Sequence, residues 1–70
     1  LASYIYTNNL EKAHKTSELM ETGTVAVNTG VVALPEAPFG GIKQTGYGRE
    51  GGSMAIKDYL NIKYTHLGIK

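Results

Sequence analysis

This chain of 70 residues contains no cysteine and no tryptophan. Without cysteine it can form no disulfide framework, no Cys-based zinc site and no thiol nucleophile. Its two histidines are too few to build a metal cage. No apolar run approaches the length of a membrane span, and no signal-peptide pattern is found. We therefore expect a soluble, cytoplasmic protein with no metal site and no contact with a membrane.

The chain also lacks an excess of charge of one sign. Seven basic and six acidic residues are interspersed and give a net charge of +1. Nucleic-acid-binding domains present a clustered basic patch, so we expect no nucleic-acid partner. A domain of this size buries only about 60% of its unfolded surface and usually needs disulfides, metals or oligomerisation. The chain opens on Leu1 rather than on methionine, and we expect it to be part of a larger protein.

Residue periodicity predicts a strand, a helix and a second strand in the first 28 residues. Residues 2–7 are rich in β-branched and aromatic side chains and are typical of a strand. Asn8, three residues before Glu11, predicts the start of a helix. Gly23 is expected to end that helix in the left-handed conformation. With the second strand over Thr24–Asn28, this order predicts an α/β fold with two parallel strands joined by a right-handed crossover.

The rest of the chain is dominated by a loop of about two dozen residues after Asn28, which contains both prolines. A loop this long in a compact domain is usually functional. A short helix capped by Ser53 or Gly52 is predicted next, and residues 62–67 are predicted to form a final strand. The expected buried face of the short helix is Ala55, Ile56, Tyr59 and Leu60.

Residues 38–52 read Pro-Phe-Gly-Gly-Ile-Lys-Gln-Thr-Gly-Tyr-Gly-Arg-Glu-Gly-Gly and hold six of the nine glycines. Glycine serves where the backbone needs positive φ or close approach to another group. The stretch resembles the C-terminal signature of the aldehyde dehydrogenase superfamily, roughly P-F-G-G-x-K-x-S-G-x-G-R-E-G, with Thr45 in place of the serine. The order of elements in residues 1–28 and the closing Asp-Tyr-Leu and Ile-Lys-Tyr runs resemble the family too.

Within the superfamily the chain is most similar to succinate-semialdehyde and 2-oxoglutarate-semialdehyde dehydrogenases. The resemblance implies that residues 1–60 are the C-terminal portion of the catalytic domain and that residues 61–70 are an oligomerisation strand and tail. Ile62, Tyr64 and His66 are then expected at the subunit interface. The expected partners are the remainder of the dehydrogenase polypeptide, further copies in a dimer or tetramer, and a small aldehyde.

The implied activity is oxidation of a semialdehyde to the carboxylic acid, with NAD or NADP bound by residues outside this chain. In the family a cysteine thiolate attacks the aldehyde, and a glutamate-activated water hydrolyses the thioester. Both groups are expected outside this chain, so it carries no catalytic or cofactor-binding residue and is expected to be inactive alone. The resemblance places Phe39 in the aldehyde funnel. Ala33 and Leu34 lie where succinate-semialdehyde enzymes often carry serines, so a longer or less polar semialdehyde stays open.

Several residues of the motif are expected to shape the loop rather than to react. Arg49 and Glu50 are expected to cap the following helix and to tie the loop down, Lys43 to be a solvated or loop-anchoring lysine, and Asn28 to bond backbone groups. The expected structural residues of the loop are Gly40, Gly41, Gly46, Gly48, Arg49 and Glu50.

Two other functions stay open. Gly46, Gly48 and Gly51 spell G-x-G-x-x-G, the dinucleotide-binding fingerprint. That fingerprint requires a preceding strand and an acidic residue about 20 positions later, and neither is predicted here. A small phosphate-binding domain is therefore the weaker alternative. A free-standing, non-catalytic oligomerising module is the other alternative.

Overall fold

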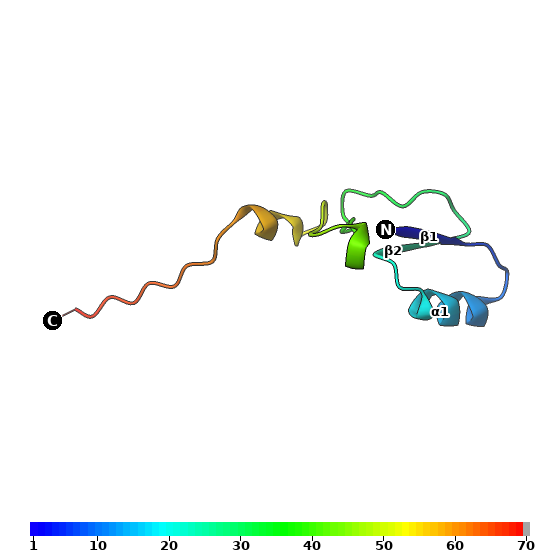
Figure 1. The fold of residues 1–70 in the computed structure, drawn as a ribbon, viewed down its shortest axis with the longest axis horizontal. Helices are drawn as coiled ribbons and strands as arrows, with labels where there is room; N and C mark the ends of the chain where they lie inside the picture. The colour runs from blue at the N-terminus through cyan, green and yellow to red at the C-terminus, as the bar shows by residue number, and fades with distance from the viewer. Residues whose placement is uncertain (70) are drawn as a thin grey trace.

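Two parallel strands and one α-helix form the first part of the protein (Figure 1). In the computed structural model, which describes residues 1–69, β1 spans Ala2–Ile5, α1 spans Leu10–Leu19 and β2 spans Thr24–Val27. The two strands are parallel, and their register pairs Ala2 with Thr24 at one end and Ile5 with Val27 at the other. The predicted βαβ arrangement of two parallel strands and a helix is confirmed.

Helix α1 begins one residue later than predicted. The N-cap is Asn9, whose side-chain oxygen accepts the backbone N–H of Lys12 at 3.0 Å, as a capping asparagine does. The prediction of Asn8 was wrong because both asparagines suit the position, and Asn9 is the one placed by the Thr7 hydroxyl, which accepts its N–H at 3.1 Å.

The predicted role of Gly23 was also wrong. The helix ends at Leu19 with an extended Met20 as its C-cap, and Gly23 is not among the glycines with positive φ. A Cβ at Gly23 would instead collide with the carbonyl of Gly40 and lie 3.1 Å from the Cα of Gly41. Gly23 is thus required by the close approach of the later loop to the start of β2.

A single asparagine closes the carboxyl end of the two-stranded sheet. Asn28 has φ of +58°, a conformation that asparagine tolerates better than most residues. Its side chain accepts the N–H of Thr7 and donates to the Thr7 carbonyl, both at 2.9 Å. The prediction that Asn28 bonds backbone groups is confirmed.

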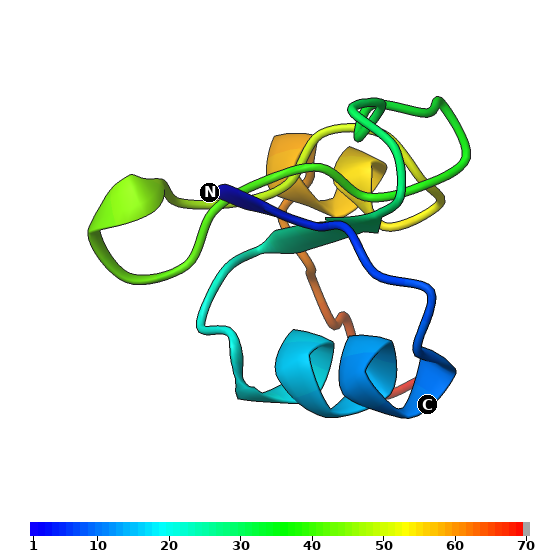
Figure 2. The ribbon, with the colours of Figure 1, turned by 90° about the vertical axis from the view of Figure 1, so that its right-hand side faces the viewer.

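The sheet lies between α1 on one side and the long loop on the other (Figure 2). Among residues 1–69, the buried apolar side chains are Ala13 of α1 and Ala26 of β2. Many larger apolar residues are exposed, including Leu10 and Leu19 of α1. Only these two small side chains are buried among the described residues, so little apolar surface stabilises the unit.

The helix predicted after Ser53 forms as a short 3₁₀ helix, η2, over Ala55–Tyr59. The prediction of its buried face was wrong. Ile56, Tyr59 and Leu60 are 62%, 84% and 60% exposed, and Ala55 alone is half-buried. Their spacing is right for an apolar stripe, but no other part of residues 1–69 covers it.

The predicted final strand over residues 62–67 is not formed. Residues 60–69 run away from the rest of the molecule as an extended tail (Figure 1), and Ile62 and Tyr64 are 98% and 83% exposed. A strand exists through hydrogen bonds to a neighbouring strand, and this tail has none beside it. The radius of gyration is consequently 17.7 Å, against about 11 Å for a compact chain of this length.

Candidate functional site

The glycine-rich segment is a closed loop pinned at its two ends. Phe39 donates its N–H to the Glu50 carbonyl at 2.6 Å, and Glu50 donates to the Phe39 carbonyl at 2.7 Å. This antiparallel pair brings the two ends of the P-F-G-G-I-K-Q-T-G-Y-G-R-E segment side by side. The position of the Phe39 backbone is therefore tied directly to that of Glu50.

Arg49 crosses the mouth of the loop from one side to the other. Its Nη1 donates to the Gly41 carbonyl at 2.6 Å and to the Gly48 carbonyl at 2.9 Å, and the side chain is half-buried. These bonds fit the expectation that Arg49 ties the loop down. The expected helix capping was wrong, because the N-cap of η2 is Met54 and no side-chain hydrogen bond caps it.

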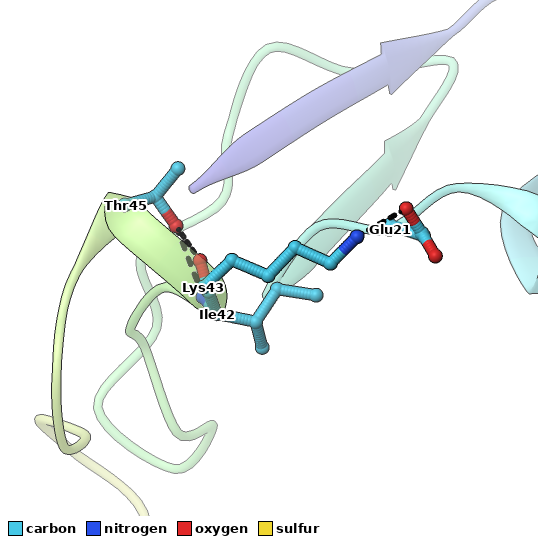
Figure 3. A network of polar contacts seen from close by, with 4 residues as sticks. All are labelled: Glu21, Ile42, Lys43 and Thr45. Atoms are coloured by element: carbon cyan, nitrogen blue, oxygen red, sulfur yellow. Dashed lines mark hydrogen bonds and ion pairs between the residues drawn. The ribbon is translucent and has the colours of Figure 1, made fainter.

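The far end of the loop turns at the 3₁₀ helix η1, Lys43–Thr45 (Figure 3). The Thr45 hydroxyl accepts the Ile42 N–H at 3.0 Å and donates to the Ile42 carbonyl at 2.6 Å. A serine at this position would offer the same hydroxyl. Lys43 forms an ion pair with Glu21, which lies between α1 and β2. The loop is thus anchored to the βαβ unit, although both groups are exposed and such pairs stabilise little.

Gly48 is the glycine whose conformation the loop requires most clearly. Its φ is +75°, and a Cβ there would lie 2.8 Å from Oδ2 of Asp58. The same Oδ2 accepts the backbone N–H of Arg49 at 2.9 Å. An L side chain at position 48 would therefore be strained and would also displace the Asp58 carboxylate.

These contacts border a cavity of about 320 Å³ that is open to solvent. Phe39, Arg49, Glu50, Asp58 and Tyr59 line it together with the backbone of the loop glycines. Leu1, Thr45 and Tyr47 line it as well, so aromatic and charged residues share the wall with exposed peptide groups, and no cysteine or serine lies in it. The arrangement can shape and bind a small molecule, but it holds no thiol, and the Thr45 hydroxyl is engaged with the Ile42 carbonyl.

The structure gathers some of the predicted site residues and separates others. Phe39 and the predicted loop residues Gly40, Gly41, Gly46, Gly48, Arg49 and Glu50 all line the cavity. Ala33 and Leu34 are exposed on the preceding part of the loop and do not line it. Ile62, Tyr64 and His66 lie on the tail, where the Tyr64 hydroxyl is 3.1 Å from Nδ1 of His66.

The sequence analysis missed the role of one cavity residue. Asp58 falls on the helix predicted after Ser53, and the Asp-Tyr-Leu run that it opens resembles the family without indicating a contact with the loop. Its contact with Arg49 depends on how the eight intervening residues fold back, which local periodicity does not report.

The loop does not fit a dinucleotide. Gly46, Gly48 and Gly51 follow the 3₁₀ helix η1 rather than a strand, and the next helix, η2, begins only at Ala55 and is itself 3₁₀. The phosphate site of the fingerprint needs a strand leading directly into the N-terminus of an α-helix.

Among residues 1–69, no helix has the length and apolar character that crossing a bilayer requires.

Comparison with known proteins settles the family. The family model described as "Aldehyde dehydrogenase family" matches residues 1–65. The chain belongs to the aldehyde dehydrogenase family. This match includes the βαβ unit, the glycine loop and most of the tail.

Three curated relatives are similar over nearly the whole chain. A succinate semialdehyde dehydrogenase from Acinetobacter baylyi is 52% identical over 68 residues, and a glutarate-semialdehyde dehydrogenase from Pseudomonas aeruginosa is 50% identical over 68 residues. A 3-sulfolactaldehyde dehydrogenase from Pseudomonas putida is 52% identical over 68 residues. Each comparison covers 97% of this chain and 14% of the relative, so the chain spans about one seventh of their length.

The fold is similar to the matching part of solved family members. A crystal structure titled "E. coli NADP dependent enzyme" superimposes with a TM-score of 0.88 at 46% identity. The superposition covers 99% of this chain and 14% of that structure. The arrangement described above is thus one that the family uses as a small piece of a larger enzyme.

Proposed function

We propose that this chain is the C-terminal part of an NAD(P)-dependent semialdehyde dehydrogenase. In this proposal residues 1–60 complete the catalytic domain, and residues 61–70 are an oligomerisation strand and tail. The identity of 50–52% to semialdehyde dehydrogenases across 97% of the chain is the observation that carries it. The exposed apolar surfaces of α1, η2 and the tail support it, because such surfaces mark contacts with further protein.

The substrate class we propose is a small aldehyde with an anionic group at its far end. Succinate semialdehyde and glutarate semialdehyde carry a distal carboxylate, and 3-sulfolactaldehyde carries a sulfonate. The relatives named for these three compounds are about equally similar to this chain. Their shared chemistry therefore defines the class better than any one of the names.

This chain would supply a wall of the substrate pocket rather than the reacting groups. Phe39 is fixed by its two backbone bonds to Glu50 and faces a cavity that the loop encloses. An aromatic wall packs against the carbon chain of the aldehyde and keeps water from it. Ala33 and Leu34, on the approach to the loop, would contribute the rim. The hydride acceptor, NAD or NADP, would be bound by residues outside this chain.

The direct test is a steady-state assay of the full-length enzyme that carries this segment. NAD⁺ and NADP⁺ are each paired with succinate semialdehyde, glutarate semialdehyde and an uncharged aldehyde of matched length. We expect reduction of one or both cofactors, with kcat/KM at least about tenfold higher for the charged aldehydes, the worth of one good charge-assisted contact. Equal or faster turnover of the uncharged aldehyde would refute the substrate class, and no cofactor reduction with any aldehyde would refute the activity.

A further inference from the structure

One acidic side chain outside the glycine-rich motif holds the glycine loop in place. Oδ2 of Asp58, near the end of η2, accepts the backbone N–H of Arg49 at 2.9 Å. The same oxygen lies over Gly48, so closely that a Cβ there would be 2.8 Å away. The carboxylate therefore occupies the space that the missing side chain of Gly48 leaves open.

The contact reaches Phe39 through two further steps. Arg49, whose N–H Asp58 binds, uses its guanidinium to join the Gly41 and Gly48 carbonyls across the mouth of the loop. The next residue, Glu50, exchanges two backbone hydrogen bonds with Phe39. A shift of the Arg49 backbone would move Glu50 and, with it, the Phe39 backbone to which Glu50 is hydrogen-bonded.

We propose that Asp58 is a positioning residue for the substrate pocket, acting through Arg49 and Glu50 on Phe39. This inference rests on the proposed function, since it concerns how the enzyme of which this chain is a part holds its aldehyde. A hydrogen bond that an ionised carboxylate accepts from a backbone N–H is stronger than a neutral one. Asp58 supplies one to the residue next to the Phe39–Glu50 pair, in a loop whose glycines give it little stiffness.

The experiment compares Asp58→Ala, Asp58→Asn and the control Glu18→Ala in the full-length enzyme. Glu18 is an exposed carboxylate on α1, away from the loop. For Asp58→Ala we expect kcat/KM for the aldehyde to fall about tenfold, mainly through KM, with KM for the cofactor unchanged. Asn keeps an acceptor oxygen of similar size but not the charge, so Asp58→Asn should recover part of the loss, and Glu18→Ala should match the wild type.

A double-mutant cycle separates positioning from a general loss of structure. If Asp58 acts through Phe39, the effects of Asp58→Ala and Phe39→Ala on kcat/KM will not multiply, and the double variant will resemble Phe39→Ala alone. Multiplying effects, or a fall in kcat and melting temperature with an unchanged aldehyde KM, would overturn the proposal.

Hydrogen exchange distinguishes this proposal from the proposed function. In Asp58→Ala, the amides of Phe39, Arg49 and Glu50 should exchange about tenfold faster than in the wild type. Unchanged exchange overturns the role of Asp58 even in an active dehydrogenase. Faster exchange in a protein that oxidises no aldehyde would refute the proposed function and leave the Asp58 contact standing.

Discussion

At the scale of single residues, the conformation of the loop depends on a few positions at which we expect substitution to be unfavourable. Gly48 combines a φ of +75° with the nearby Asp58 carboxylate, and Phe39 is bound through its backbone on both its N–H and its carbonyl. Gly48 is required for the backbone conformation of the loop, and the backbone bonds of Phe39 fix where that residue lies. They predict different consequences of substitution.

Replacing Gly48 by valine should destabilise the loop. A β-branched residue resists positive φ, and its Cβ would meet Oδ2 of Asp58 at 2.8 Å. We expect a loss of about 2–3 kcal/mol of local stability and a strong fall in activity, measured by thermal unfolding and kcat/KM of the full-length enzyme. Gly30→Val is the matched control, because a Cβ at Gly30 meets nothing within 4 Å. Equal effects of the two substitutions would contradict this reading of Gly48.

Replacing Phe39 by alanine should affect the aldehyde and not the cofactor. Removal of the ring widens the pocket and admits water, so we expect kcat/KM for the aldehyde to fall about tenfold or more while KM for NAD⁺ or NADP⁺ stays constant. Steady-state kinetics with each substrate varied in turn measure both. If neither constant moves, Phe39 is an ordinary packing residue.

At the scale of elements, local patterns were sufficient where neighbouring residues decide the conformation. The strands, α1 and their parallel order could be predicted because their signals lie within the 28 residues that form them. The loop was singled out as a candidate site through its resemblance to the family motif rather than through local periodicity. Two features that the sequence did not predict depend on distant partners: Gly23 on the Gly40 carbonyl, and Asp58 on the Arg49 amide. The strand at residues 62–67 needs a partner strand that residues 1–69 do not provide.

The start of α1 offers a test between two adjacent asparagines. Asn9→Ala removes the side-chain oxygen that accepts the Lys12 N–H and should cost about 1 kcal/mol of stability. Asn8→Ala should cost little, because the Asn8 side chain forms no hydrogen bond within the part of the chain that the structure describes. Chemical denaturation of the two variants of the full-length enzyme measures the difference. A larger loss for Asn8→Ala would show that the helix begins where the sequence pattern first placed it.

At the scale of the whole molecule, the shape is elongated and leaves most apolar side chains uncovered, as expected of a segment of a larger protein. The long axis is 67 Å, the tail stands clear of the sheet, and the buried apolar residues found are two alanines among residues 1–69. Parallel sheets are normally covered on both faces, and here α1 covers one face only in part. The proposed function attributes the missing contacts to the rest of a longer dehydrogenase and to neighbouring subunits.

The tail predicts a change of assembly when its apolar side is charged. Side chains alternate along an extended chain, so we expect Ile62 and Tyr64 to share one side of the proposed interface strand and Thr65 to take the other. Ile62→Asp with Tyr64→Asp should dissociate the full-length enzyme into smaller species, measured by sedimentation velocity, because buried carboxylates in an interface are strongly unfavourable. Thr65→Asp is the matched control. An unchanged sedimentation profile for the double variant would place the subunit interface elsewhere.

The distance from the Phe39 ring to a bound ligand is the most direct measurement of all. It requires a crystal structure of the full-length enzyme with succinate or glutarate, the product carboxylates, in the active site. We expect the ring to contact the ligand's carbon chain within about 4.5 Å, with Asp58 still bound to the Arg49 amide. A ligand bound with the Phe39 ring and the glycine loop well outside contact distance would contradict the role proposed for this chain.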